Sequence, residues 1–207
     1  MKMRSVQEAF HNGLVIQRLL DRLKRLGIVI DPFYLFLEGT HDTTLPSVEG
    51  EFQVCQITSE NLPLLTTLGS AVTIEKLQER LAKGHICIAL RHKGYVVAYT
   101  WADTTEINDS TYRTKLGENE VYLYDAFTRP EYRGRGLAPL MRVRCYETLR
   151  ALGKSTFFSI SDCFNTPAIR FKRKLNARFV RLCVSLRIGN RKLGVWTIKT
   201  YPRVQEE

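Results

Sequence analysis

The strongest constraint on the fold lies in residues 120–152, where a strand pattern passes into a helix pattern across a short turn rich in glycine. Val121 to Thr128 is rich in aromatic and β-branched residues, as a strand should be, and Pro130 ends it. Apolar residues at helical spacing then share one face: Leu137, Leu140, Met141, Cys145, Leu149 and Leu152. Pro139 fits this helix, because a proline in the first helical turn removes an N–H group that has no partner there.

The turn itself, Arg133 to Ala138, reads RGRGLA and has the features of a phosphate-binding loop. Its two glycines allow a ligand to come close to the backbone. The free N–H groups and the positive dipole end of the following helix favour an anion, and Arg133 and Arg135 add positive charge. The loop lacks the third glycine of a dinucleotide fingerprint and the Gly-Lys-Ser/Thr of a P-loop. An ordinary glycine turn in a basic protein is the alternative interpretation.

Positive charge is concentrated in the C-terminal part of the chain. Residues 129–207 hold 18 Lys and Arg against 5 Asp and Glu, a net charge of +13, whereas residues 1–128 have a net charge of −3. The basic part begins at the proposed phosphate loop, which fits a polyanionic cofactor. Nucleic acid or an anionic membrane surface could use the same charge. Because the chain shows no helix-turn-helix, zinc or aromatic RNA signature, we rank a nucleic-acid partner last.

Composition and cysteine usage indicate a globular protein of a reducing compartment. The chain has 207 residues, which fits one domain with an added terminal segment. Five cysteines are scattered without a C-x-x-C pair, which argues against a disulfide framework and a zinc site, and the four histidines lack metal-ligand spacing. No apolar run approaches the ~18 residues of a membrane span, and the first residues lack a signal peptide. The sequence therefore predicts a cytoplasmic protein without a metal ion.

The first 50 residues are predicted to form an extension, and residues 51–207 the main domain. Ser5 to Leu26 has the pattern of a basic amphipathic helix, which docks on a core or lies on a membrane surface. Ile28 to Leu37 is apolar and aromatic but is broken by Asp31-Pro32, so we expect an edge strand or a buried connection. Glu38 to Gly50 is polar and turn-rich, and it is the best candidate for a linker.

From residue 52 onward, strand and helix patterns alternate in a definite order. The elements expected before the central strand are a strand at Phe52–Thr58, helices at Ser59–Leu68 and Thr73–Lys83, strands at His85–Arg91 and Tyr95–Trp101, and a long polar loop at Asp103–Asn119. The elements expected after the central helix are a strand at Ser155–Ile160, a helix at Asn165–Leu175, and strands at Arg178–Arg187 and Leu193–Tyr201. The order is therefore β-α-α-β-β-β-α-β-α-β-β.

The loop and this order of elements together resemble a known family. Arg133-x-x-Gly136-x-Ala138, within the string PEYRGRGLA, resembles the Arg/Gln-x-x-Gly-x-Gly/Ala signature of the GCN5-related N-acetyltransferase (GNAT) superfamily. The resemblance extends over residues 52–201. It implies a GNAT-like acyl-CoA N-acyltransferase fold, an α/β (α+β) mixed sheet of about seven strands flanked by helices, here with an extra N-terminal helix and strand. It also implies that the loop wraps the pyrophosphate of acetyl-CoA.

A second stretch, NTPAIRF from Asn165 to Phe171, is similar to the segment that opens the next helix in that family. The resemblance implies that Asn165 and Phe171 contact the cofactor, although asparagine is also a favoured N-cap. The chain departs from the family at Lys172, where a tyrosine often protonates the leaving thiolate. A lysine there could still donate a proton if its pKa were lowered, but we expect it to point to solvent or phosphate, and the acid role of the tyrosine does not transfer. Asn176 replaces a family glycine and can adopt the same left-handed conformation.

The resemblance implies direct attack of an amine on the acyl thioester. A backbone N–H of Phe127 or Thr128 is the candidate to hold the thioester carbonyl. Tyr124 and Asp125, expected on opposite faces of the central strand, are the candidate catalytic bases, and a structural hydrogen bond is the alternative for Asp125. The full set of predicted cofactor-binding residues is Phe127, Thr128, Arg133, Gly134, Arg135, Gly136, Leu137, Ala138, Asn165 and Phe171.

The leading functional hypothesis is an N-acetyltransferase that moves an acetyl group from acetyl-CoA to a primary amine, either a small molecule or an amino sugar. One alternative uses a longer acyl-CoA as co-substrate, with the N-terminal helix in peripheral contact with a membrane. Another is a non-catalytic relative that only binds acyl-CoA. The two C-terminal strands are candidates for pairing across a homodimer. The sequence does not identify the acceptor, because fold does not fix function.

Overall fold

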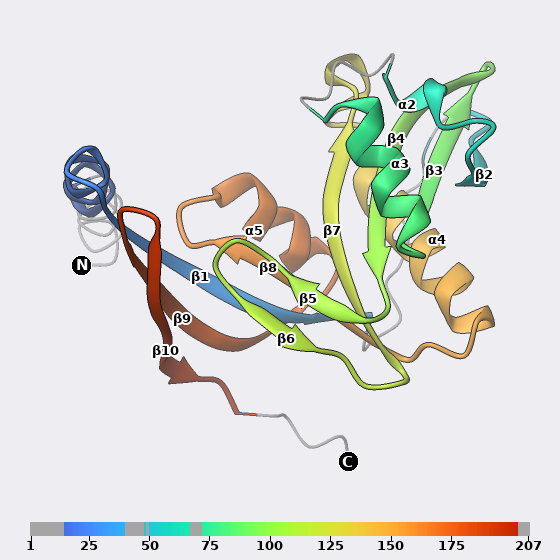
Figure 1. The fold of residues 1–207 in the computed structure, drawn as a ribbon. Helices are drawn as coiled ribbons and strands as arrows, with labels where there is room; N and C mark the ends of the chain where they lie inside the picture. The colour runs from blue at the N-terminus through green and yellow to red at the C-terminus, as the bar shows by residue number, and fades with distance from the viewer. Residues whose placement is uncertain (1–14, 40–47, 49, 67–71, 203–207) are drawn as a thin grey trace, which may run out of the picture.

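A computed structural model describes residues 15–39, 48, 50–66 and 72–202 of the chain (Figure 1). One large sheet contains strands β1 (Ile28–Glu38), β2 (Gln53–Ile57), β3 (Ile86–His92), β4 (Tyr95–Asp103), β7 (Glu120–Thr128), β8 (Thr156–Asp162), β9 (Arg178–Ile188) and β10 (Arg191–Thr200). Their order across the sheet is β10-β9-β1-β8-β7-β4-β3-β2. The pair β7–β8 is parallel, and the other neighbouring pairs are antiparallel. The predicted mixed sheet flanked by helices is confirmed.

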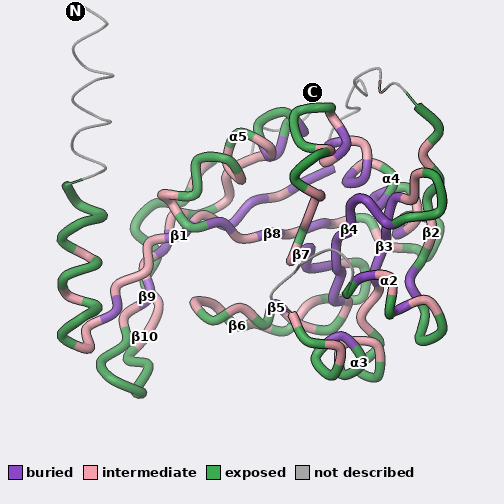
Figure 2. Tube along the Cα trace, turned by 90° about the horizontal axis from the view of Figure 1, so that it is seen from above, coloured by how far each residue is buried: buried purple, intermediate pink, exposed green. Residues whose placement is uncertain are grey.

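Helices cover both faces of the β2-β3-β4-β7 part of the sheet. They are α2 (Pro63–Thr66) and α3 (Ile74–Ala82) on one face and α4 (Leu137–Ala151) on the other, while the 3-10 turn η1 (Pro130–Tyr132) follows β7 and α5 (Thr166–Lys174) lies beside β8 and β1 (Figure 1). Alternation along β3 assigns each face: Cys87 and Ala89 pack with Leu77 of α3, whereas Ile88 packs with Cys145 of α4. Figure 2 shows the most buried segments along β3, β4 and α4. The core therefore lies between α3, the sheet and α4.

Strands β7 and β8 pair only at their beginnings. The pairing runs from Glu120↔Thr156 to Tyr122↔Phe158, so the later residues of both strands have no partner across this gap. The loop that follows β7 leads into α4, and the loop that follows β8 leads into α5. The separation of two parallel neighbours thus opens the sheet beside the N-terminal ends of both helices.

Strand β1 corrects the expectation of an edge strand or a buried connection at residues 28–37. It lies inside the sheet, antiparallel to β8 on one side and to β9 on the other. Asp31-Pro32 does not break it, because pairing with β8 begins only at Phe33, and Pro32 lies where β1 pairs with β9 alone. The division of the chain at residue 50 stays a prediction, although β1 shares one sheet with the strands after that point.

The predicted polar loop at 103–119 contains a small hairpin of β5 (Glu106–Asn108) and β6 (Arg113–Lys115). Side-chain turns organise it: Asp103 Oδ1 accepts hydrogen bonds from the Thr105 N–H and hydroxyl, and Asp109 Oδ1 accepts the equivalent pair from Thr111. The three-residue strands are too short and too polar to give an alternating pattern in the sequence.

Several predictions about the termini concern residues outside the described ranges. The predicted N-terminal helix is described only from residue 15, where it runs helical to residue 25, and most of the predicted linker also lies outside. At the far edge of the sheet, β10 exposes Leu193, Trp196 and Ile198. Pairing of the C-terminal strands across a dimer stays a prediction. Among the described helices, none has both the length and the apolar character needed to cross a bilayer.

Candidate active site

A cavity of about 1030 Å³ lies at the gap between β7 and β8 and reaches the first turns of α4 and α5. It brings together nine of the ten predicted cofactor-binding residues: Phe127, Thr128, Arg133, Gly134, Gly136, Leu137, Ala138, Asn165 and Phe171. The tenth, Arg135, is exposed, and its guanidinium lies 5.4 Å from the centre of the Tyr132 ring. Tyr124 and Asp125 also line this cavity.

The loop from η1 to α4 has the backbone of an anion cradle. Gly134 and Gly136 have φ angles of 79° and 77°, in the left-handed region that glycine adopts without strain. A Cβ added at Gly134 would meet no atom within 4 Å, so the space over the loop is open to a ligand. The first α-helical bond runs from the Leu140 N–H to the Gly136 carbonyl at 3.2 Å, and the N–H groups before it have no partner within the helix. These features fit a pyrophosphate.

One buried polar atom beside the cavity also fits a bound ligand. Arg142, on α4, is 2% exposed and lines the cavity. Its Nη1 atom makes no hydrogen bond with the described residues, and the guanidinium lies 5.6 Å from the centre of the Phe171 ring. An unsatisfied buried donor is costly, so a carbonyl or carboxylate oxygen from a ligand would stabilise it. Pantetheine carries such carbonyl groups.

Arg142 belongs to a buried polar cluster that corrects the expected position of Lys172. Lys172 does not point to solvent: it is 4% exposed, and its Nζ donates to Ser159 Oγ at 2.5 Å and lies 3.6 Å from the Glu38 carboxylate. Glu38 also accepts hydrogen bonds from Tyr146 and Ser159 and lies 3.4 Å from Arg142 Nε. Burial lowers the pKa of Lys172 to about 8, although Glu38 opposes the shift.

Asp125 lies in a β-bulge, which explains its side-chain direction. Tyr99 pairs with Phe127 and Trp101 with Tyr124, so Asp125 and Ala126 both lie opposite one residue of β4. The φ angle of Asp125 is 46°, an uncommon left-handed conformation for a residue other than glycine. Asp125 Oδ2 accepts a hydrogen bond from Arg80 Nη1 at 2.5 Å. This ion pair favours the structural role that was the alternative to catalysis.

The bulge also makes one prediction wrong. Tyr124 and Asp125 are expected on opposite faces of β7, but both contact Arg80 of α3: its guanidinium bonds to Asp125 and lies 5.1 Å from the centre of the Tyr124 ring. The extra residue in the bulge and its left-handed backbone cancel the alternation of side chains at this point. The two candidate bases therefore share the face covered by α3.

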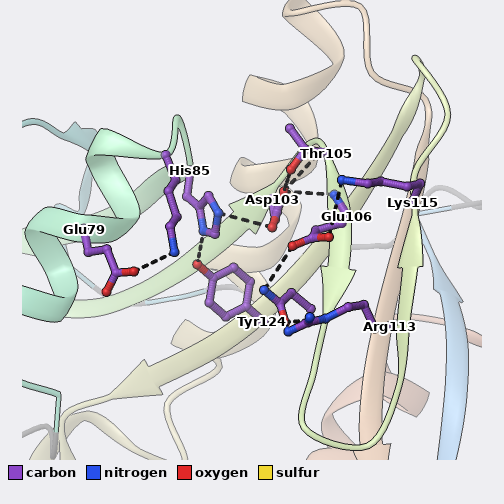
Figure 3. A network of polar contacts seen from close by, with 10 residues as sticks. Glu79, His85, Asp103, Thr105, Glu106, Arg113, Lys115 and Tyr124 are labelled. Carbon is purple, nitrogen blue, oxygen red and sulfur yellow. Dashed lines mark hydrogen bonds and ion pairs between the residues drawn. The ribbon is translucent and has the colours of Figure 1, made fainter.

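On this face, Tyr124 ends a chain of three polar side chains (Figure 3). Its hydroxyl lies 2.5 Å from His85 Nδ1, and His85 Nε2 lies 3.2 Å from Asp103 Oδ2. Asp103 is 2% exposed, and its other oxygen accepts hydrogen bonds from Thr105 and from the Glu106 N–H. Burial lowers the pKa of His85, with Asp103 opposing the shift, and burial raises the pKa of Tyr124 well above its usual range.

The sequence interpretation missed His85 and Asp103, although a signal was present. Spacing along the sequence bears on metal ligation by the histidines and not on contacts across a hairpin. In the predicted hairpin of strands β3 and β4, Ile86 pairs with Ala102, so His85 and Asp103 follow as the next opposite positions. The hairpin register alone would have brought an imidazole and a carboxylate together beside the end of β7.

A second cavity, of about 520 Å³, lies on the α3 side of β7. It is lined by Lys76, Glu79, Arg80, Lys83, His85, Asp103, Thr105, Glu106, Asn108, Lys115, Tyr122 and Tyr124, all of them polar or carrying a polar tip. Tyr124 lines both cavities. In the described part of the chain, no three or more His, Cys, Asp or Glu side chains gather closely enough to hold a metal ion.

The arrangement of sheet, loop and cavity agrees with a comparison against protein families. The model of the Acetyltransferase (GNAT) family matches residues 54–177. The chain belongs to this family. GNAT members use acyl-CoA as co-substrate. The match begins in β2 and ends before β9, so β1, β9 and β10 lie outside it.

Solved structures show the same fold at low sequence identity. An acetyltransferase of the GNAT family from Colwellia psychrerythraea aligns with a TM-score of 0.57 at 12% identity, over 77% of this chain and 57% of that one. A tandem GNAT protein from the clavulanic acid biosynthesis pathway has a TM-score of 0.56 at 14% identity, over 78% of this chain and 55% of that one. This chain thus spans little more than half the length of either GNAT structure.

A third structure is a GCN5-related glucosamine N-acetyltransferase region of a fungal multi-domain beta-N-acetylglucosaminidase. It aligns with a TM-score of 0.56 at 15% identity, over 80% of this chain and 22% of that one. A search of curated proteins gives no match. At these identities the likeness concerns the fold alone, and the acceptor must be argued from the cavities of this chain.

Proposed function

We propose that this GNAT member transfers an acetyl group from acetyl-CoA to a primary amine, by direct attack of the amine on the thioester. The observation that carries the proposal is the position of Tyr124, which lines both the larger cavity beside the glycine loop and the smaller polar cavity under α3. Two cavities that meet at one side chain provide a place for each of two substrates. Bringing two reactants together is itself a large part of catalysis.

The larger cavity is proposed to hold the co-substrate. The loop of Gly134 and Gly136 and the start of α4 would bind the pyrophosphate, and Arg133, Asn165 and Phe171 line the same space. Arg142 would donate to an oxygen of the pantetheine arm. When bound, acyl-CoA supplies an activated acyl group as a thioester. We infer that the residues of β7 from Asp125 to Thr128, which line this cavity, lie beside the acyl group.

The smaller cavity is proposed to hold the acceptor. Its lining carries four Lys or Arg and three Asp or Glu side chains, and no aliphatic residue contributes to it. Such a lining suits a small polar amine or an amino sugar, because polar groups on the acceptor would find partners there. A long alkyl amine would leave these charged side chains desolvated and unpaired.

Calorimetric titration with acetyl-CoA and longer acyl-CoAs tests the co-substrate site. The variant Gly134→Val places a side chain in the open space of the loop, and Gly153→Val is its matched control. Both glycines have a φ angle of 79° and nothing within 4 Å of an added Cβ, but Gly153 lies beyond the other end of α4. Equal backbone strain is therefore expected in both variants.

We expect the Gly134 variant to bind acetyl-CoA at least tenfold more weakly, about 1.4 kcal/mol, and the Gly153 variant to bind normally. A panel of polar amines and amino sugars, followed by thiol release, then tests transfer. Absence of acyl-CoA binding to the natural chain would refute the co-substrate assignment. Binding without turnover on any amine would leave a non-catalytic acyl-CoA-binding protein, and a preference for long acyl chains would refute the acetyl assignment.

A further inference from the structure

We propose that Tyr124, His85 and Asp103 form a proton relay that removes a proton from the acceptor amine. The inference rests on the proposed function and names the residues that carry its proton transfer. Of the three, only Tyr124 lines both cavities and so faces both proposed substrates; His85 and Asp103 line the smaller cavity alone and are proposed to act through Tyr124. Neither the glycine loop nor the family match identifies these three residues, which lie on the opposite face of β7 from α4.

The direction of the hydrogen bonds follows from the Asp103 end of the chain. Asp103 is buried, and its Oδ1 accepts from Thr105 and Glu106, while its Oδ2 lies 3.2 Å from His85 Nε2, where a negative oxygen favours a proton on that nitrogen. With the proton on Nε2, a neutral imidazole presents an unprotonated Nδ1 to Tyr124. The Tyr124 hydroxyl therefore donates to His85 Nδ1, at 2.5 Å. Its oxygen lone pairs remain free to accept a proton from a substrate.

Burial decides which protonation states the relay holds at rest. The lowered pKa of His85 keeps the ring neutral and able to accept a proton, and the raised pKa of Tyr124 keeps the phenol protonated. The charged groups near His85 are Asp103, Glu106 and Glu79, which favour its imidazolium form, and Arg80 and Lys83, which oppose it. Because a phenolate is disfavoured, Tyr124 can accept a proton only while passing its own to His85.

The proposed step balances without another reactant. The acceptor enters as an ammonium ion, its proton moves to the Tyr124 oxygen, and the phenolic proton moves to His85 Nδ1. The freed lone pair attacks the thioester carbon, and the new C–N bond forms. As the C–S bond breaks, the second proton on nitrogen passes to the sulfur, which leaves as the thiol. The imidazolium, stabilised by Asp103, then returns its proton through Tyr124 to solvent.

The test compares a basic amine with hydroxylamine, a nucleophile that is already unprotonated at neutral pH. Loss of general-base catalysis costs about 10²–10⁴-fold in rate. We expect Tyr124→Phe, His85→Gln and Asp103→Asn to lower kcat for the basic amine by about 100-fold or more, with acyl-CoA binding unchanged. For hydroxylamine the loss should be less than about tenfold, because no proton needs to be removed before attack.

The matched control is His92→Gln, at the other end of the same hairpin. His92 Nδ1 lies 3.0 Å from the Glu51 carbonyl oxygen, and neither cavity includes it. We expect this variant to keep normal rates with both nucleophiles. Equal losses for both nucleophiles in the relay variants would indicate a structural role and overturn the relay, as would a Tyr124→Phe variant within about threefold of the natural chain.

A second measurement needs no acceptor and separates failure of the relay from failure of the proposed function. Nitrogen-15 NMR of His85 reports which ring nitrogen carries the proton. The relay predicts a neutral ring protonated at Nε2, and a loss of that tautomer preference in Asp103→Asn. A ring protonated at Nδ1 in the natural chain could not accept from Tyr124 and would overturn the relay, even if acyl transfer were observed.

Discussion

Substitution of Glu38 by glutamine should destabilise the fold more than any surface change, because this carboxylate serves two buried cations. Glu38 lies at the end of β1 and is 1% exposed. Arg142 of α4 lies 3.4 Å from it and Lys172 of α5 lies 3.6 Å from it, while Tyr146 and Ser159 donate hydrogen bonds to it. The cluster therefore joins β1, β8 and the two helices that border the larger cavity.

The size of the expected loss in stability follows from the two buried cations, Arg142 and Lys172, that remain when the carboxylate is removed. Glu38→Gln keeps the shape and one acceptor oxygen but leaves two buried cations facing no carboxylate among the described residues. Removing one partner of a buried ion pair costs about 3–5 kcal/mol. In a chain of this length, each kcal/mol lowers the midpoint of thermal unfolding by about 2–4 °C, so we expect a fall of about 6–20 °C. The double variant with Lys172→Met, which has one cation less, should recover about 1–2 kcal/mol.

Lys172 adds a pH dependence whose sign is fixed by its shift. Burial lowers its pKa to about 8 from the ordinary 10.5. Between these values the unfolded chain still holds a proton that the folded chain has released, so the free energy of unfolding rises with pH, by about 3 kcal/mol across the window. Below pH 8 the folded chain bears the full cost of burying the protonated Lys172 amine. Glu38 affects stability at acidic pH instead. Its pKa is lowered in the folded chain, so the stabilisation that its carboxylate provides is lost as the pH falls through that lowered pKa.

The assay is urea unfolding followed by circular dichroism at pH 7, 8 and 10, with the natural chain, both single variants and the double variant. Tyrosines and cysteines titrate in the same range, so the informative quantity is the difference between the natural chain and Lys172→Met at each pH. The reasoning is refuted if Glu38→Gln lowers the free energy of unfolding by less than about 1 kcal/mol. It is also refuted if the effects of the two substitutions on that free energy are simply additive in the double variant. A difference that stays flat from pH 8 to pH 10 would refute the assigned state of Lys172.

Two further predictions concern residues that the sequence singled out. Asp125→Asn keeps a residue that tolerates a positive φ angle but removes the charge that faces Arg80, so we expect a change of less than tenfold in acyl transfer, measured by thiol release; a loss of 10²-fold or more would instead make Asp125 the base. The Asn165 side chain accepts a hydrogen bond from the Ala168 N–H at 3.1 Å as an N-cap. Asn165→Ala should cost about 1 kcal/mol in urea unfolding, and Asn165→Ser should restore most of it; acyl-CoA binding that is weak in both would show a direct contact with the cofactor.

The fold and the cofactor loop could be predicted from the sequence because the patterns that indicate them are local. A strand, two glycines and an amphipathic helix follow one another in residues 120–152, and each has its own periodicity or composition. The structure then placed nine of the ten predicted cofactor residues around one cavity. Arg135 lies outside it because successive residues of a loop cannot all face the same ligand.

The features that could not be predicted from the sequence depend on contacts between residues far apart in the chain. The proline in β1 suggested a break, and only the late start of β8 pairing shows why it is tolerated. Side-chain direction at Asp125 depends on a bulge, whose extra residue no alternation reveals. His85 and Tyr124 are 39 positions apart, so their contact required the order of three strands. Lys172 looked like a surface lysine because its counter-ion comes from Glu38, 134 positions earlier.

The buried cluster around Lys172 shows why this side chain, at the position where the resemblance places the family tyrosine, is not directed at a leaving thiolate. Lys172 is held by Ser159, the Ile160 carbonyl and Glu38, so its three protons are already engaged on the α5 side of the cavity. Glu38 comes from β1, outside the residues that match the family model, and without its carboxylate the buried lysine would lose its counter-ion. A lysine fixed in this way forms part of the cavity wall. The proposed relay for the acceptor proton lies apart from this cluster, on the opposite face of β7, where the Tyr124 hydroxyl lies 2.5 Å from His85 Nδ1.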